Sequence, residues 1–219
     1  MDKDIILFDL DGTLTDSAPG VTKAYSLALE SVGIHEKPEN LKKVLGPPLD
    51  YSLTSFFGVP AEKLDTALDV YRSHYIMDGA LYENSVYPGV EQLLRDLHRA
   101  GRRLVVASSK RQDLVEAVIR HFRLDPYFDL MAGSDWEVGR STKEEVLRYV
   151  VDSLPIPDLG RAVMVGDRMY DVEGASKLGI PAVGVLWGYG NRQELISAGA
   201  SEVVETPREL YELLCRPAP

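Results

Sequence analysis

Short apolar runs alternate with segments of helical spacing along most of this 219-residue chain, and this alternation limits the folds open to it. Most of the runs are apolar throughout, which is typical of strands buried on both faces of a parallel sheet. Gly101 and Gly179 each end a helical segment a few residues before a new run begins. The pattern predicts an α/β fold, a parallel sheet covered on both faces. The expected strands lie at residues 5–8, 104–107, 162–165, 182–186 and, most weakly, 202–204.

One long segment breaks the alternation. Residues 17–85 show helical spacing, as in PGVTKAYSLALESVG and AEKLDTALDVYRSHYI, without a convincing strand, and the segment is too long for a single crossover. We therefore expect a helical domain at 17–85 inserted into an α/β core formed by residues 1–16 and 86–219. Because the insertion begins just after the first strand, it would act as a lid over the end of that strand.

Composition narrows the classes of partner. The chain has 34 acidic and 24 basic residues and a formal net charge of -10, which disfavours nucleic acid and anionic membranes. A single cysteine, Cys215, rules out an internal disulfide and fits a reducing compartment. The first apolar run stops at Asp9, too early for a signal peptide or a membrane span. We expect a cytoplasmic monomer or homodimer whose partner is a small molecule.

Asp9 and Asp11 stand two residues apart where the first apolar run ends. A carboxylate at a strand end can attack an electrophile, and a second one nearby can exchange protons with the leaving group. An Asp-x-Asp-Gly sequence is also typical of a simple turn. A calcium-binding loop is a further alternative, but its pattern fails at Thr13, Leu14 and Gly20.

Ser108, Ser109 and Lys110 directly follow the expected strand at 104–107. Hydroxyl groups and backbone amides at a strand end can donate hydrogen bonds to phosphoryl oxygens. The alternative is that the serines only cap the next helix. On its own, this segment does not decide between the two.

Lys143 lies in the segment GRSTKEEVL, where Ser141 or Thr142 fits the N-cap of a helix. The helix dipole disfavours a lysine in the first turn, so this position suggests a need for positive charge there. The alternative is an exposed lysine in a turn rich in lysine and glutamate.

Asp167 and Asp171 follow the apolar run at 162–165. Asp167 can reach a cation at the sheet edge, and Asp171, one helical turn later, can support it. An oxygen-only ligand set suits Mg²⁺ better than zinc. The alternative is a pair of acids that favour a helix N-terminus. Several acids at one edge would repel each other unless a divalent cation and Lys143 lie among them.

Four segments together resemble the signature motifs of the haloacid dehalogenase superfamily phosphatases: DLDGTLTDS, VVASSK, the lysine of RSTKEEV, and VGDRMYD, in the correct order and covering essentially the whole chain. The resemblance implies a Rossmann-like core with an inserted helical cap. It also implies that Asp9 is the nucleophile that forms an aspartyl phosphate, and that Asp11 is the general acid and then base. Ser108 would donate a hydrogen bond to the phosphoryl group, and Lys143 would neutralise its charge. Mg²⁺ would be held by Asp9, the backbone carbonyl of Asp11 and Asp167, with Asp171 in support.

Within the superfamily, the chain is most similar to the phosphoglycolate phosphatase and 5'-nucleotidase-like branch. Phosphoglycolate phosphatases usually have proline after the motif lysine, whereas Glu144 follows Lys143 here, which favours the nucleotidase-like subgroup. A phosphomutase on the same core and a signalling domain that is phosphorylated without turnover remain alternatives. Substrate contacts are expected from Ser109 and Lys110 in the core. In the cap they are expected from Lys42, Lys43, the loop Gly46-Pro47-Pro48, Arg72 and Tyr75.

Overall fold

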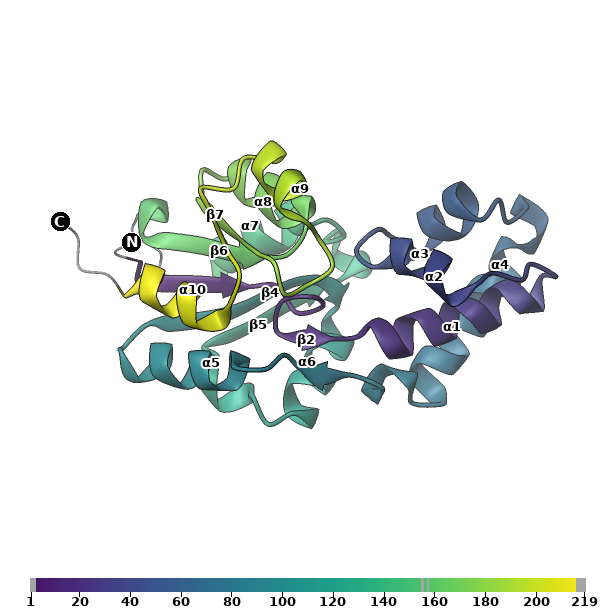
Figure 1. Cartoon of the computed structure of the whole chain (residues 1–219), viewed down its shortest axis with the longest axis horizontal. Coiled ribbons are helices and arrows are strands. Elements are labelled where there is room, and N and C mark those ends of the chain that lie inside the picture. Colours follow the sequence, from purple (N-terminus) through teal and green to yellow (C-terminus); the bar gives the residue numbers. More distant parts are fainter. Residues whose placement is uncertain (1–2, 155, 157, 216–219) are drawn as a thin grey trace. The chain divides into compact units, whose positions relative to one another are not determined.

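The protein consists of two compact units, Met1–Thr15 with Val86–Pro219 (unit 1) and Asp16–Ser85 (unit 2). The structure is a computed structural model that describes residues 3–154, 156 and 158–215 (Figure 1). Within these residues, no helix combines the length and the apolar character needed to cross a membrane.

Unit 1 is built on a six-stranded sheet whose strands are all parallel, which confirms the predicted α/β class. Phe8, the last residue of the first strand, lies between Val106 and Val165 of its two neighbours. The amide of Asp9 still donates to the carbonyl of Val165 at 2.9 Å, so the ladder continues past the strand end. In spatial order the strands are β5 (Leu130–Ser134), β4 (Arg103–Arg111), β1 (Ile5–Phe8), β6 (Ala162–Gly166), β7 (Ala182–Val185) and β8 (Glu202–Val204).

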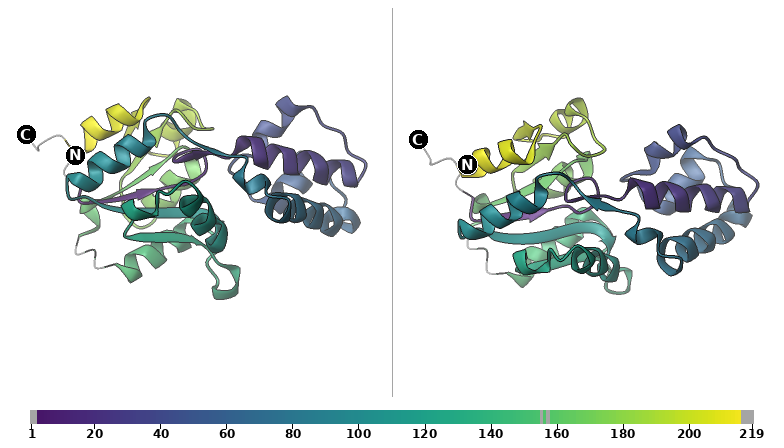
Figure 2. Two further views of the ribbon diagram at one scale, coloured as in Figure 1. Left: turned by 90° about the horizontal axis from the view of Figure 1, so that it is seen from below. Right: turned by 60° about the horizontal axis from the view of Figure 1, so that its bottom comes forward.

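Helices cover both faces of this sheet, and Figure 2 shows α5 (Val90–Arg99) and the yellow α10 (Pro207–Leu214) side by side on one of them. Leu7 and Val105 of the sheet share an apolar cluster with Leu147 of α7 (Lys143–Ser153) and Val172 of α8 (Met169–Ser176). Because side chains alternate along a strand, the equally buried Phe8 faces the opposite layer. One layer contains α7 (Lys143–Ser153), α8 (Met169–Ser176) and α9 (Arg192–Ser197), and the other α5 (Val90–Arg99), α6 (Gln112–His121) and α10 (Pro207–Leu214).

The sheet differs from the sequence prediction in two places. The edge strand β5 was not predicted, because LMAGS is short and ends in glycine and serine. Strand β4 was expected to end at Ala107 but continues to Arg111, with a register irregularity relative to β5 between these residues. Ser108, Ser109 and Lys110 therefore belong to the strand rather than to a loop after it.

Unit 2 is mainly helical. Its longer helices are α1 (Ala18–Ser31) and α4 (Ala61–Arg72), which continues as a single π-helical turn at Ser73–Met77. Tyr25 and Leu29 of α1 share an apolar cluster with Leu53 and Ala67. The short helices are α2 (Pro38–Leu41) and α3 (Leu49–Tyr51), and the two chain connections form a two-stranded sheet of β2 (Thr15–Asp16) and β3 (Ser85–Val86).

Candidate active site

Lys143, the first residue of α7, is buried against Asp9, which directly follows β1, and Asp171 of α8. Its ammonium lies 2.7 Å from Oδ1 of Asp9 and 2.8 Å from Oδ1 of Asp171, and it donates to the carbonyl of Ala107 at 2.7 Å. Burial lowers the pKa of Lys143, but the charges of Asp171 and Asp9 outweigh this effect and the pKa is raised overall. The lysine is therefore charged and held at the edge of the sheet.

A capping box fixes the start of α7. Thr142 Oγ1 accepts from the Glu145 amide at 3.3 Å, and the Glu145 carboxylate accepts from the amides of Ser141 and Thr142 at 2.8 and 2.9 Å. The hydrogen bonds from the Ser141 and Thr142 amides lower the pKa of Glu145 to about 2. The acid in the first turn offsets the unfavourable dipole at Lys143, so the lysine is tolerated there.

Asp167 and Asp171, at the end of β6 and in the first turn of α8, are fully buried. Burial raises the pKa of Asp167 well above its usual range, and the charges of Asp171 and Asp9 raise it further. Burial also raises the pKa of Asp171 to about 6, although Lys143 opposes the shift. Asp167 and Asp171 thus lie close to one ammonium and to each other, an arrangement that disfavours a negative charge on both.

The residues present fit a divalent cation. One carboxylate oxygen from each of Asp9, Asp167 and Asp171 lies within 4.8 Å of the others. A cation among them would relieve the repulsion that raises the pKa of Asp167. The donors are hard oxygens without cysteine or histidine, which is the set that Mg²⁺ prefers.

The segment 187–190, which follows β7, packs around Asp167. The Tyr189 amide donates to Oδ2 of Asp167 at 2.7 Å, and the Thr13 hydroxyl donates to Oδ1 at 3.2 Å. Trp187 Nε1 in turn donates to the Thr13 carbonyl at 2.9 Å. A Cβ at Gly190 would lie 1.9 Å from the carbonyl oxygen of Asp167, so only glycine fits. The sequence alone predicts no role for this segment, although two glycines flank a tyrosine shortly after the strand.

Asp11 lies outside the three-acid cluster. Its Oδ2 is 2.6 Å from the ammonium of Lys110, whereas its Oδ1 is buried and accepts no hydrogen bond from the described residues. Ser108 is buried and its hydroxyl accepts from the Lys110 amide at 3.3 Å, while Ser109 is exposed. The structure thus brings Asp11 and Lys110 together. Asp11 lies two residues after Asp9 in the chain, and Lys110 lies two residues after Ser108.

The predicted cap residues lie in unit 2 and have contacts of their own there. The Lys43 ammonium lies 4.3 Å from the ring centre of Phe57 and donates to the Phe56 carbonyl at 3.2 Å. Tyr75 is buried and stacks on Tyr71 with ring centres 5.4 Å apart. The remaining candidates are Lys42, which is exposed, Gly46, which has a φ of 115°, and Arg72, which is exposed.

A family model described as haloacid dehalogenase-like hydrolase matches residues 6–185 of the chain. A protein from Pseudomonas aeruginosa named 5'-nucleotidase is 38% identical over 87% of this chain and 86% of its own length. A protein from Mycobacterium tuberculosis named tyrosine-protein kinase PtkA is 38% identical over 95% of this chain and 70% of its own length.

Two further similarities point the same way. A phosphoglycolate phosphatase from Caulobacter vibrioides is 31% identical over 98% of this chain and 94% of its own length. The crystal structure of a predicted phosphatase from Clostridium acetobutylicum superimposes with a TM-score of 0.89 at 42% identity, covering 97% of this chain and 98% of the other.

Proposed function

The chain belongs to the haloacid dehalogenase-like hydrolase family, among its phosphatases, and from this premise we propose that it hydrolyses small phosphate monoesters through an aspartyl phosphate on Asp9. The observation that carries the proposal is the convergence of Asp9, Lys143, Asp167 and Asp171 at one edge of the sheet. This arrangement combines a nucleophile, a positive charge and a set of cation ligands, which phosphoryl transfer requires.

Asp9 is proposed as the nucleophile. Lys143 holds Oδ1 of Asp9, which leaves Oδ2 for in-line attack on the phosphorus. The bond between Asp9 and phosphorus forms while the ester bond to the leaving oxygen breaks. The hydroxyl of Ser108 is proposed to donate a hydrogen bond to a phosphoryl oxygen, and the positive charge of Lys143 stabilises the negative charge of the phosphoryl group in the transition state.

Asp11 is proposed to move the protons. It donates a proton to the departing oxygen in the first step, and then accepts one from the water that cleaves the aspartyl phosphate. Its Oδ1 is buried without a hydrogen-bond partner among the described residues, so that oxygen is available for the proton. Lys110 holds the other oxygen and keeps the carboxyl group in place.

Mg²⁺ is proposed as the cofactor, held by Asp9, Asp167 and the Asp11 carbonyl, with Asp171 in support. When bound, it would neutralise phosphoryl charge and orient the group for attack. The cluster of carboxylate oxygens and the raised pKa of Asp167 support this assignment.

A 5'-nucleotide is the substrate class that we propose first. The 5'-nucleotidase relative is more similar to this chain than the phosphoglycolate phosphatase, 38% against 31% identity, and Glu144 replaces the proline expected after the motif lysine. Unit 2 is proposed to act as a cap that selects the leaving group. Initial rates on nucleotides, phosphoglycolate, sugar phosphates and phosphotyrosine would test this choice.

The decisive experiment measures p-nitrophenol release from excess p-nitrophenyl phosphate with Mg²⁺. Wild-type protein should release many equivalents per enzyme, and Asp9→Asn should release none while it keeps the wild-type thermal unfolding curve. Asp152→Asn, which changes an exposed acid on α7, is the matched control and should retain full turnover. Phosphorylation that stops at one equivalent would support a signalling domain instead, and isomerised sugar phosphate without free phosphate would support a phosphomutase.

A second candidate is phosphoryl transfer to tyrosine, favoured by the similarity to PtkA over 95% of this chain. In that case the acceptor of the phosphoryl group would be a phenol hydroxyl instead of water. Incubation with radiolabelled ATP and a tyrosine-containing peptide separates the two: labelled peptide supports transfer, and labelled free phosphate alone supports hydrolysis.

A further inference from the structure

Strand β4 bulges where it carries Ser108, Ser109 and Lys110. Ala107 is paired with Ala132 of β5, and the next pair is Arg111 with Ser134. Four steps along β4 thus correspond to two along β5, so two extra residues leave the ladder. The bulge places Ser108, Ser109 and Lys110 at the carboxyl edge of the sheet. Because these residues leave the ladder, β5 lacks backbone hydrogen-bond partners on β4 at this point.

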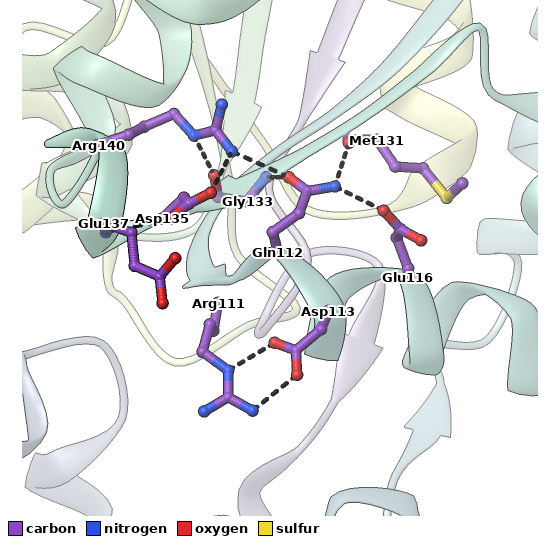
Figure 3. Close-up of polar contacts among 9 residues, drawn as sticks. All are labelled: Arg111, Gln112, Asp113, Glu116, Met131, Gly133, Asp135, Glu137 and Arg140. Carbon is purple, nitrogen blue, oxygen red and sulfur yellow. Dashed lines mark hydrogen bonds and ion pairs between the residues drawn. The ribbon is translucent and has the colours of Figure 1, made fainter.

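The side chain of Gln112 takes the place of the missing strand partner (Figure 3). Its Nε2 donates to the Met131 carbonyl at 2.9 Å, and its Oε1 accepts from the Gly133 amide at 2.7 Å. The carboxamide therefore pairs with β5 as a peptide group would. Gly133 is required for this approach, because a Cβ there would lie 2.7 Å from the Lys110 carbonyl and from the Gln112 Cα.

Arg140 contacts both Gly133 and the side chain of Gln112. Its Nε donates to the Gly133 carbonyl at 2.7 Å and its Nη2 to Oε1 of Gln112 at 3.4 Å, and its guanidinium lies 4.0 Å from the ring centre of Tyr149 on α7. Asp135 and Arg140 also exchange backbone hydrogen bonds at 2.6 and 2.8 Å. The buried arginine thus fixes the segment that ends three residues later at Lys143.

We propose that Gln112, Gly133 and Arg140 form a brace that sets the position of the Ser108–Lys110 bulge relative to Lys143. The proposal rests on the proposed function, in which both segments bind the transferring phosphoryl group. Gln112 and Arg140 are positioning residues, since they act through Ser108 and Lys143. Because small misplacements of such groups slow catalysis strongly, removal of the brace should lower kcat more than it raises KM.

The test compares Gln112→Met, Arg140→Met and the double variant. Each single variant should lower kcat for p-nitrophenyl phosphate by about 10- to 100-fold. The kcat of the double variant should be about equal to that of the slower single variant, because both residues act through one brace and their effects do not add. Arg140→Lys keeps the charge but cannot bind both groups at once, and should lie between Arg140→Met and wild type.

Two controls replace side chains of the same kind outside the brace. Gln92→Met on α5 and Arg148→Met on α7 remove exposed intrahelical contacts and should keep the wild-type kcat. All rates are measured at temperatures where circular dichroism shows full folding, so lower stability alone leaves kcat unchanged. Wild-type kcat in folded Gln112→Met and Arg140→Met, with Asp9→Asn inactive, would refute the brace and leave the proposed function intact.

Hydrogen exchange tests the brace without any assay of turnover. Gln112→Met should speed exchange of the amides at 141–145, and Arg140→Met should speed exchange at 108–111, each effect lying across the brace from the substitution. Exchange that stays at wild-type rates in both segments would overturn the proposal. If wild-type protein has no phosphatase activity, the proposed function fails, and these exchange rates still decide the structural coupling.

Discussion

At the scale of single residues, the balance of charge at Lys143 dominates the site. One buried ammonium faces Asp9 and Asp171 directly, and Asp167 lies next to both acids. Burial favours neutral forms of the acids, and Lys143 and a bound cation favour the charged forms. Because burial raises the pKa of Asp167 and of Asp171, we expect the binding of a cation to be coupled to the release of protons from this site.

Lys143→Met should abolish most of the activity and destabilise the fold. Without the ammonium, buried acids lose their partner, which costs about 3 kcal/mol, and the phosphoryl charge loses a stabilising group, which lowers kcat by at least about 100-fold. Urea unfolding and steady-state rates measure the two effects. Lys177→Met, which removes an exposed ion pair with Glu144, is the control and should change both little. Equal stabilities of Lys143→Met and wild type would contradict this charge balance.

The metal-free protein should lose stability as pH rises from about 4 to 6. The pKa of Asp171 is raised to about 6 in the folded state, so between these limits the folded state binds more protons than the unfolded state. The unfolding free energy from Asp171 therefore falls by up to about 3 kcal/mol over this range. Urea unfolding with a chelator at several pH values would show this as a difference in slope between wild type and Asp171→Asn. Parallel pH curves for the two proteins would count against it.

At the scale of elements, the site is held by segments at strand ends, and the sequence revealed only part of them. The positions of Asp9 and Asp167 follow from apolar runs that end in acids, a pattern visible in the sequence. The roles of Gln112 and Arg140 were not visible, because they depend on a bulge in β4 and on the unpredicted strand β5. The contact of Tyr189 with Asp167 was also hidden, since it uses a backbone amide, which every residue except proline offers.

Gly190→Ala should weaken metal binding. The new Cβ would lie 1.9 Å from the Asp167 carbonyl, so the segment 187–190 must move and release the Oδ2 of Asp167. Titration calorimetry should show a lower Mg²⁺ affinity, by about 10-fold or more, as for other residues that support metal ligands. Gly179→Ala, strained by its φ of 71° but in open space, should lose stability and keep the wild-type affinity. Equal Mg²⁺ affinities of Gly190→Ala and Gly179→Ala would exclude this role for the segment.

At the scale of the whole molecule, every proposed reacting group belongs to unit 1. Unit 2 has its own apolar core, and the chain enters and leaves it through β2 and β3, which are hydrogen-bonded neighbours. From the sequence, a helical insertion at 17–85 is predicted because this long stretch shows helical spacing without a convincing strand. The proposed effect of unit 2 on substrate choice would depend on side chains such as Lys43, whose contacts within unit 2 the sequence did not reveal.

Replacement of Asp16–Ser85 by a short glycine-serine linker should leave a folded unit 1. The ends to be joined lie on paired strands, so the loop costs little entropy to close. The shortened protein should still hydrolyse p-nitrophenyl phosphate in the presence of Mg²⁺, but it should no longer prefer one phosphate monoester over another. The relative kcat/KM values of a substrate panel measure this. A folded but inactive core would mean that unit 2 supplies a group needed for the chemistry.

The amide of Asp9 remains hydrogen-bonded to the carbonyl of Val165 beyond the end of β1, which holds the backbone of the proposed nucleophile at the edge of the sheet. Under the proposed mechanism, the alcohol must depart from the side opposite Asp9, and water must arrive from that same side. Each displacement inverts the configuration at phosphorus, and two displacements in succession restore the original configuration. A chiral thiophosphate ester labelled with oxygen isotopes would then yield a product of unchanged configuration.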